Sequence, residues 1–294
     1  MSARPDRRCC EDDPMAGSVK DLIALLDLEC IEADLFRGRS PETAMQRVFG
    51  GQVAAQALVA AGRTVDPERP VHSLHAYFLR PGDPAVPLIY AVERARDGRS
   101  FTTRRVVARQ HNTPIFVMSA SFHQAEPGQD HQDPMPEAPE PESLPTIAAL
   151  ADEDAQRWSV LRDQFASVDV RFPRRPGAGS HAAASRAWMR IAEPLPDDPL
   201  LHVCLLAYLS DLTLLSVSLV PHRVRPFVDQ VFMASLDHAL WFHRRFRADE
   251  WLLYDQVSPS ATGGRGLAAG RIFARSGAHV ATVMQEGLIR TRLG

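Results

Sequence analysis

Apolar residues occupy every helical face of the stretch from Leu200 to Val220, which reads LLHVCLLAYLSDLTLLSVSLV and contains one charged residue, Asp211. A helix that is apolar all round either lies inside a protein or crosses a membrane. A carboxylate and several hydroxyl groups would be costly in lipid, and the sequence has no second apolar run of this length. We therefore expect a central core helix and no membrane span, with Asp198 and Pro199 at its start and Pro221 at its stop.

From Val71 to Phe122 the apolar positions alternate with a period of two, which is typical of half-buried strands. The four segments HSLHAYFLRPG, PLIYAVERARDG, SFTTRRVVARQ and PIFVMSASFH are separated by turn residues. Small residues from Val53 to Ala61 predict a closely packed helix before them, and Ser18 to Leu35 predicts a short amphipathic helix on the surface. This part of the chain is predicted to fold as a helix followed by an antiparallel meander.

The same order of elements recurs after the central helix. SLHAYFLRP is similar to SLDHALWFHRR with a one-residue slip, PLIYAVE to WLLYDQV, DGRSF to GGRGL, and IFVMSASF to ATVMQEGL. The repeat predicts two similar α+β units, at residues 18–123 and 148–294. Residues 124–147, rich in proline and acidic side chains, are predicted to form a linker, and residues 1–17 a disordered tail.

The two units differ in the polar residues that they carry. The C-terminal unit has Asp211 on its helix, Ser235 or Asp237 on its first strand and Gln285 on its last strand, where the N-terminal unit has Ser119. A buried carboxylate requires either hydrogen-bonding partners or a chemical role. We therefore predict one active site per chain, in the C-terminal unit, with the N-terminal unit supplying walls and backbone donors.

Composition limits the partners of this 294-residue chain. A net charge of −3 and a pI near 6.4 argue against a binder of nucleic acid or of anionic membranes. Lys20 is the only lysine, so a lysine nucleophile has no candidate in the folded part. The four cysteines, Cys9, Cys10, Cys30 and Cys204, lack the spacing of a zinc site, so no metal is expected. With no apolar signal segment at the N-terminus, we expect a reduced cytoplasmic protein.

Several segments carry a family resemblance when they are taken in order. FGGQVAAQAL, HSLHAYFLRPGD, DGRSF, LAYLSDLTLL, SLDHALWFHR, EWLLY and VATVMQEGLIR resemble the acyl-CoA thioesterase II family, over Asp21 to Arg290. The resemblance implies a double hotdog fold, in which each half wraps a curved antiparallel sheet around a long helix. It also implies hydrolysis of acyl-CoA to free acid and CoA. The family's triad of Asp, Ser or Thr, and Gln falls on Asp211, Ser235 and Gln285. Because such sheets often pair at their edges, a homo-oligomer is expected.

Thioester hydrolysis suits these residue types. Water suffices as the nucleophile, without a cofactor, if a carboxylate takes its proton while a hydroxyl and an amide hold it, and general base catalysis of this kind is worth roughly 10²–10⁴-fold. The N–H of Gly51 at a helix N-terminus is a candidate donor to the thioester oxygen. Arg99 and Arg265, at equivalent turns, are candidates to bind the phosphates of CoA. A covalent serine route is disfavoured, because the sequence has no G-x-S-x-G motif.

Two other functions are compatible with the sequence. An enoyl-CoA hydratase or dehydratase would pair the carboxylate with a histidine, for which His202 or His238 could serve if either reached Asp211. A non-catalytic module that binds acyl-CoA would keep the groove without turnover. Asp211 itself could also be a structural carboxylate that satisfies nearby backbone or serine groups.

Overall fold

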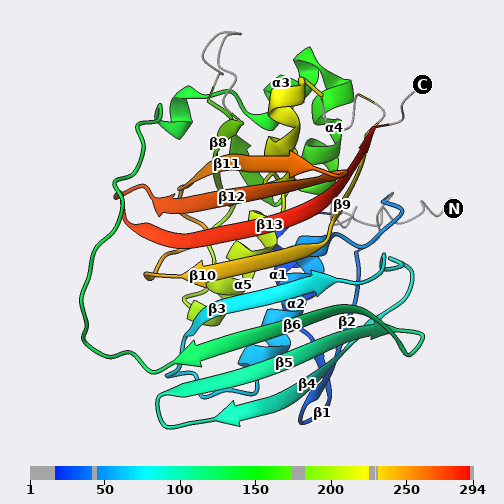
Figure 1. The fold of residues 1–294 in the computed structure, drawn as a ribbon, viewed down its shortest axis with the longest axis vertical. Helices are drawn as coiled ribbons and strands as arrows, with labels where there is room; N and C mark the ends of the chain where they lie inside the picture. The colour runs from blue at the N-terminus through cyan, green and yellow to red at the C-terminus, as the bar shows by residue number, and fades with distance from the viewer. Residues whose placement is uncertain (1–16, 42–44, 174–182, 225–228, 230, 292–294) are drawn as a thin grey trace, which may run out of the picture.

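The computed structural model describes residues 17–41, 45–173, 183–224, 229 and 231–291, so the predicted tail lies outside the described residues except for Gly17. Within these ranges the strands form one antiparallel sheet of 13 strands (Figure 1). The strand order is β1-β2-β4-β5-β6-β3-β10-β13-β12-β11-β8-β7, and β9 pairs with β13 off this path. The chain is therefore an α+β protein, as predicted.

The strands are β1 (Glu29–Glu32), β2 (Leu35–Gly38), β3 (Val71–Phe78), β4 (Leu88–Asp97), β5 (Phe101–Gln110), β6 (Thr113–His123), β7 (Val168–Arg171), β8 (Ala184–Ile191), β9 (Val231–Ser235), β10 (Asp237–Phe242), β11 (Leu252–Thr262), β12 (Arg265–Ala274) and β13 (His279–Thr291). The α-helices are α1 (Val19–Leu26), α2 (Gly50–Gly62), α3 (Ile147–Glu153), α4 (Ala155–Gln164) and α5 (Pro199–Ser210). Two 3₁₀ helices are η1 (Pro141–Ser143) and η2 (Leu215–His222).

The sheet has the same strand order on both sides of its centre. Read outward from the centre, β3, β6, β5, β4, β2 and β1 correspond to β10, β13, β12, β11, β8 and β7. At the centre β3 pairs with β10, with Leu74 opposite Leu240, so the two halves share a continuous hydrogen-bonded sheet. In Figure 1, α2 and α5 lie on the same side of this sheet, behind it in that view. The repeat seen in the sequence thus corresponds to a repeat of strand order.

One apolar core joins the two halves. The alanines of α2 let that helix approach its neighbours closely, and Ala54, Ala57 and Ala60 are fully buried. Leu205 and Leu209 of α5 are also fully buried and belong to the same cluster. Because α2 and α5 pack against each other, the ends of one helix lie beside the ends of the other.

The predicted central helix is shorter than its apolar pattern suggests. Helix α5 ends at Ser210, residues 211–214 form a turn, and the apolar run continues as the 3₁₀ helix η2. The hydroxyls of Ser210 and Ser216 donate to the carbonyls of Ala207 and Thr213, and such bonds compete with the regular helix. By length and composition the stretch Pro199–His222 could cross a membrane, but 67% of its most apolar window is buried inside the protein, as in a core helix.

Two predictions for the N-terminal half were wrong in detail. The meander is incomplete, because β3 pairs with β6 and β10 and does not pair with its successor β4. Leaving the edge of β3 open to β10 is what allows the two half-sheets to join. The surface helix ends at Leu26, where Asp27 caps it, and β1 and β2 follow as a hairpin with an ion pair between Arg37 and Glu29.

The predicted linker begins without helix or strand, and η1 and the start of α3 occupy its end. Acidic side chains fix it to the second half of the sheet, since Asp133 pairs with Arg271, and both Glu140 and Glu142 pair with Arg275. In Figure 1 this segment runs around one side of the molecule, from the end of β6 toward α3. Its acidic residues therefore bind arginines of the half that follows it.

Candidate active site

Asp211 lies where the C-terminal end of α5 meets the N-terminal end of α2. It is the C-cap residue of α5, and its carboxylate accepts a hydrogen bond from the backbone N–H of Gly51 in the first turn of α2. The first N–H groups of a helix lack partners within that helix, and they favour an anion. Glycine at position 50 leaves the necessary room, since a Cβ there would lie 2.7 Å from Asp211 Oδ2. The two halves of the chain therefore build this site together.

Two further polar side chains meet Asp211 from neighbouring strands. Gln285 of β13 donates from Nε2 to Asp211 Oδ1 at 2.5 Å and to Ser235 Oγ at 2.9 Å. Ser235 ends β9, is paired with Gly287 of β13, and also hydrogen-bonds the carboxylate. The structure thus brings together the three residues predicted for catalysis. Asp237, the alternative to Ser235, accepts instead from the N–H of Glu286.

Burial sets the charge state of this carboxylate. It raises the pKa of Asp211 to about 6, while the hydrogen bonds from Gln285, Gly51 and Ser235 oppose that rise because they favour the ionised form. Asp211 as a whole residue is partly exposed to solvent, although protein surrounds its carboxylate closely. A group with this pKa is mostly ionised at neutral pH and still accepts a proton readily, which suits a general base.

Three residues lie behind Asp211, and of these the sequence analysis named only His238, for the alternative hydratase or dehydratase chemistry. Tyr254 of β11 donates its hydroxyl to the carbonyl of Ser210 at 3.1 Å, and His238 Nε2 lies 2.8 Å from Ser210 Oγ. All three are fully buried. Their hydrogen bonds fix the last turn of α5, and Asp211 is the residue that directly follows this turn. Sequence offered only a weak signal for them, because a histidine, a tyrosine and a serine in apolar segments are common in cores.

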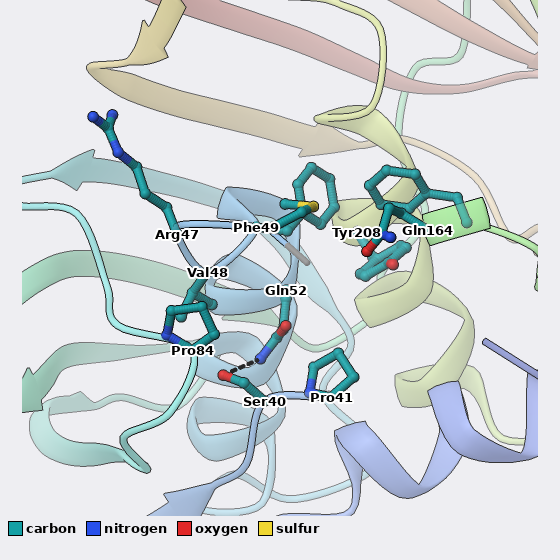
Figure 2. Close-up of a pocket in the computed structure, with 11 residues that line it drawn as sticks. Ser40, Pro41, Arg47, Val48, Phe49, Gln52, Pro84, Gln164 and Tyr208 are labelled. Carbon is teal, nitrogen blue, oxygen red and sulfur yellow. Dashed lines mark hydrogen bonds between the residues drawn. The ribbon is translucent and has the colours of Figure 1, made fainter. Parts of the chain in front are cut away.

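A small pocket of about 40 Å³ adjoins the site on the other side of the α2 N-terminus (Figure 2). Phe49 and Tyr208 line it and also contact the backbone around Gly51, since a Cβ at Gly51 would lie 2.6 Å from the Phe49 ring and from the Tyr208 carbonyl oxygen. Gln52 turns toward one wall, where it donates to Ser40 Oγ. The lining residues are Ser40, Pro41, Met45, Arg47, Val48, Phe49, Gln52, Pro84, Gln164, Phe165 and Tyr208.

The predicted phosphate-binding arginines make no contact with the three catalytic candidates. Arg265, at the start of β12, is half exposed and donates to Glu286 at 3.0 Å. Arg99 lies in the turn between β4 and β5, in the other half of the sheet, with an exposed side chain. Arg47, which the sequence analysis did not name, lines the pocket and has its guanidinium 4.9 Å from the ring of Phe232 on β9, the strand of Ser235.

The histidines named for dehydratase chemistry do not reach the carboxylate. His238 bonds Ser210, and burial lowers its pKa to about 3, so the ring is neutral. His202 accepts from the N–H of Ala248 and lies in the first turns of α5, roughly 13 Å along the helix from Asp211 at 1.5 Å per residue. In the described part of the chain, no cluster of His, Cys, Asp or Glu could hold a metal ion. The geometry offers a carboxylate base with a hydroxyl and an amide beside it, which can activate a water molecule.

Comparison with known proteins identifies the family of the chain. A family profile described as acyl-CoA thioesterase matches residues 158–288, and one described as acyl-CoA thioesterase N-terminal domain matches residues 39–123. The chain is 40% identical to human acyl-coenzyme A thioesterase 8, over 99% of this chain and 96% of that protein. It is 51% identical to an acyl-CoA thioesterase II from Mycobacterium marinum, whose crystal structure aligns with a TM-score of 0.79 over 92% of this chain and 98% of that one. A hot dog fold protein from Alicyclobacillus acidocaldarius, 22% identical, aligns with a TM-score of 0.74 over 92% and 97% of the two chains and shares the fold.

Proposed function

This chain belongs to the acyl-CoA thioesterase family, whose members are thioester hydrolases, and we propose that it hydrolyses fatty acyl-CoA to a free fatty acid and CoA on Asp211. The observation that carries the proposal is the hydrogen-bonded meeting of Asp211, Ser235 and Gln285. A carboxylate, a hydroxyl and an amide are the groups needed to hold and deprotonate one water molecule.

In the proposed mechanism, Asp211 takes a proton from a water molecule as the water oxygen attacks the thioester carbonyl carbon. Ser235 orients the water, and Gln285 holds both the Ser235 hydroxyl and the Asp211 carboxylate in place. The resulting tetrahedral intermediate breaks its carbon–sulfur bond and expels the CoA thiolate. The thiolate takes up the proton held by Asp211, which restores the carboxylate base. The N–H of Gly51 donates to Asp211, so we assign it the role of holding the carboxylate in place of the predicted role at the thioester oxygen.

The surroundings of the site suggest where the two ends of the substrate bind. We propose that the pocket of Figure 2 receives part of the acyl chain, since aromatic and aliphatic side chains line much of it next to the N-terminus of α2. Arg47 is exposed at this pocket and packs on Phe232 of β9, which makes it a better candidate for a CoA phosphate than Arg99. Arg265 stays a candidate through its position one strand from β13.

Three broader expectations stay proposals. The two equivalent strand orders, each with one helix, support two hotdog units in tandem, with boundaries near residues 18–123 and 148–294. We also propose a homo-oligomer, which light scattering of the purified protein tests directly. Localisation to the cytoplasm is consistent with the described cysteines, Cys30 and Cys204, being free thiols.

The function is tested by incubating the purified protein with acyl-CoA esters of increasing chain length and measuring free thiol. We expect release of CoA with a preference among chain lengths. An enoyl-CoA included in the series distinguishes the alternative chemistry, because hydration removes its conjugated absorbance without releasing thiol. Saturable binding with no thiol release from any ester would contradict hydrolysis and identify a binding module.

A further inference from the structure

His238 and Gln285 lie side by side beneath the candidate active site. The register that pairs Ala239 with Met284 brings His238, the residue before Ala239, beside Gln285, the residue after Met284. Facing residues on antiparallel strands have Cβ atoms about 4.5–5.5 Å apart. Both side chains are completely buried, on the face of the sheet that covers the helices. Their hydrogen bonds therefore have to be satisfied inside the protein.

The hydrogen bonds of Ser210 favour one tautomer of His238. The Ser210 hydroxyl lies 2.9 Å from the carbonyl of Ala207, and when it donates its one proton there, its oxygen is an acceptor toward His238 Nε2. Nε2 then carries the ring proton, and Nδ1 of the neutral ring is an acceptor. Nδ1 is buried without a hydrogen-bond partner among the residues that the structure describes.

Gln285 carries the second buried acceptor that has no hydrogen-bond partner among the described residues. Its amide nitrogen is used by Asp211 and Ser235, whereas its Oε1 is buried and unpartnered within the described part of the chain. A buried acceptor without a partner destabilises the folded protein, because it has lost its hydrogen bonds to water. Two adjacent acceptors can share one molecule that donates two hydrogen bonds, and water is the molecule that commonly fills this role inside proteins.

We propose that His238 is a positioning residue for the reaction: with Gln285 it binds one buried water, which donates to His238 Nδ1 and to Gln285 Oε1. The inference rests on the proposed function of Asp211. An amide can rotate by half a turn and exchange its oxygen and nitrogen. The water fixes the orientation in which Nε2 faces Asp211 and Ser235. Without it, the amide oxygen can turn toward the carboxylate, which loses a hydrogen bond and gains a repulsive neighbour.

Loss of that orientation has a signature in the pH dependence of turnover. The hydrogen bond from Gln285 lowers the pKa of Asp211, so rotation of the amide raises this pKa and moves the acid limb of kcat to higher pH. The titratable groups beside the carboxylate, His238 of β10 and Tyr254 of β11, are uncharged near neutrality, and α2 contributes only the backbone of Gly51. Asp237 of β10 turns to the backbone of Glu286. A shift of the acid limb therefore reports on Gln285.

Two substitutions of His238 distinguish the contributions of its two ring nitrogens. His238→Asn keeps a polar acceptor near the position of Nδ1 and loses the contact with Ser210. His238→Gln reaches Ser210 with its amide nitrogen and loses the acceptor. We expect His238→Gln to lower kcat on the order of 10-fold with little change in KM, and to move the acid limb upward, because small displacements of a catalytic group are costly. His238→Asn should keep the acid limb close to that of the wild type.

A merely structural histidine gives a different result. In that case both variants keep the wild-type acid limb, and their loss of kcat follows their loss of melting temperature, which would overturn the proposal. If either variant fails to fold, a high-resolution crystal structure of the wild-type protein decides, because density for a water within hydrogen-bond distance of both acceptors is expected and its absence would refute the site. Failure of the proposed function is distinguishable, since then the wild type releases no CoA.

Discussion

The two ends of the α2–α5 helix pair show the same contact with opposite chemistry. At one end Asp211, the cap of α5, faces Gly50 and Gly51 at the start of α2. At the other end Gly62, the last residue of α2, faces Leu200 at the start of α5, whose side chain occupies the space that a Cβ at Gly62 would need. One end is therefore a polar site and the other is closed by an aliphatic side chain.

The charges at the two helix C-termini also differ. The C-terminal end of α2 is followed by Thr64, which binds the fully buried Arg104 through its hydroxyl and its carbonyl. A cation matches the negative end of a helix dipole. Asp211 instead places a carboxylate at the negative end of α5, where hydrogen bonds from Gly51 of α2, Gln285 and Ser235 compensate it. The cation at the C-terminal end of α2 stabilises the fold, whereas the carboxylate at the C-terminal end of α5 is a base whose pKa is raised.

The largest expected effect is that of Asp211→Asn. Asparagine has nearly the same shape but accepts no proton, so kcat should fall by roughly 10²–10⁴-fold with acyl-CoA affinity within a few-fold of the wild type. Thiol release and substrate titration measure both. Asp237→Asn, the same change at a neighbouring half-buried carboxylate, is the matched control and should retain turnover. Wild-type turnover in Asp211→Asn would show that this aspartate is structural.

Adding one methyl group at each end of the helix pair tests the contrast directly. Gly50→Ala puts a Cβ 2.7 Å from Asp211 Oδ2 and must displace the carboxylate, so kcat should fall on the order of 10²-fold. Gly62→Ala meets only the flexible end of Leu200, and its kcat should stay close to the wild-type value. Equal effects of the two substitutions on kcat would remove the distinction between the two ends.

Ser235→Ala and Gln285→Ala should each lower kcat about 10-fold or more, and less than Asp211→Asn does, because the base remains. Since Gln285 acts on the water through Ser235 and Asp211, the double variant should lose less than the product of the two single losses. Steady-state kinetics of the two single variants and the double variant make the comparison. Strictly multiplicative losses would indicate that Ser235 and Gln285 act separately.

Turnover should depend on pH through Asp211. Because the base must be ionised, kcat should rise as pH increases through about 6, the pKa of Asp211 in the folded protein. A carboxyl whose folded pKa is raised favours folding below its unfolded pKa of 3.8, and this contribution is lost as pH rises through about 6. Asp211→Asn should thus melt at a higher temperature than the wild type at pH 7 and show no such gain near pH 4. A gain that is independent of pH would contradict the assignment.

The smallest effect on activity is expected at the C-terminal end of α2, where Arg104 binds Thr64. Arg104→Met removes the bonds to Thr64 and to Asp97 and should cost about 1–3 kcal/mol of unfolding free energy, with kcat nearly unchanged. Urea unfolding measures the cost. Arg105→Met is the matched control, because Arg105 is exposed and its ion pair with Glu93 spans 3.6 Å. A large loss of kcat in a folded Arg104→Met protein would connect this end to catalysis.

Much of the local structure follows from patterns within short segments. The alternation from Val71 to Phe122 predicted β3 to β6, and the small residues after Gly51 predicted α2. The repeat predicted two equivalent sets of strands. The pattern failed at Asp211, because an apolar run does not reveal where serine hydroxyls bind their own helix carbonyls and end it. It also failed at β3, whose neighbour depends on a strand much later in the chain.

The sequence by itself determined which residues alternate, which segment is apolar all round, and that one carboxylate lies within that segment. Only the tertiary structure decided that this carboxylate meets the N–H of Gly51, and that His238 lies beside Gln285. The reason is physical: periodicity records which face of an element is buried, whereas the partner on that face depends on strand register and helix packing between distant segments. The pKa of Asp211 is therefore a property of the assembled fold, since burial and the donors that oppose it come from different elements.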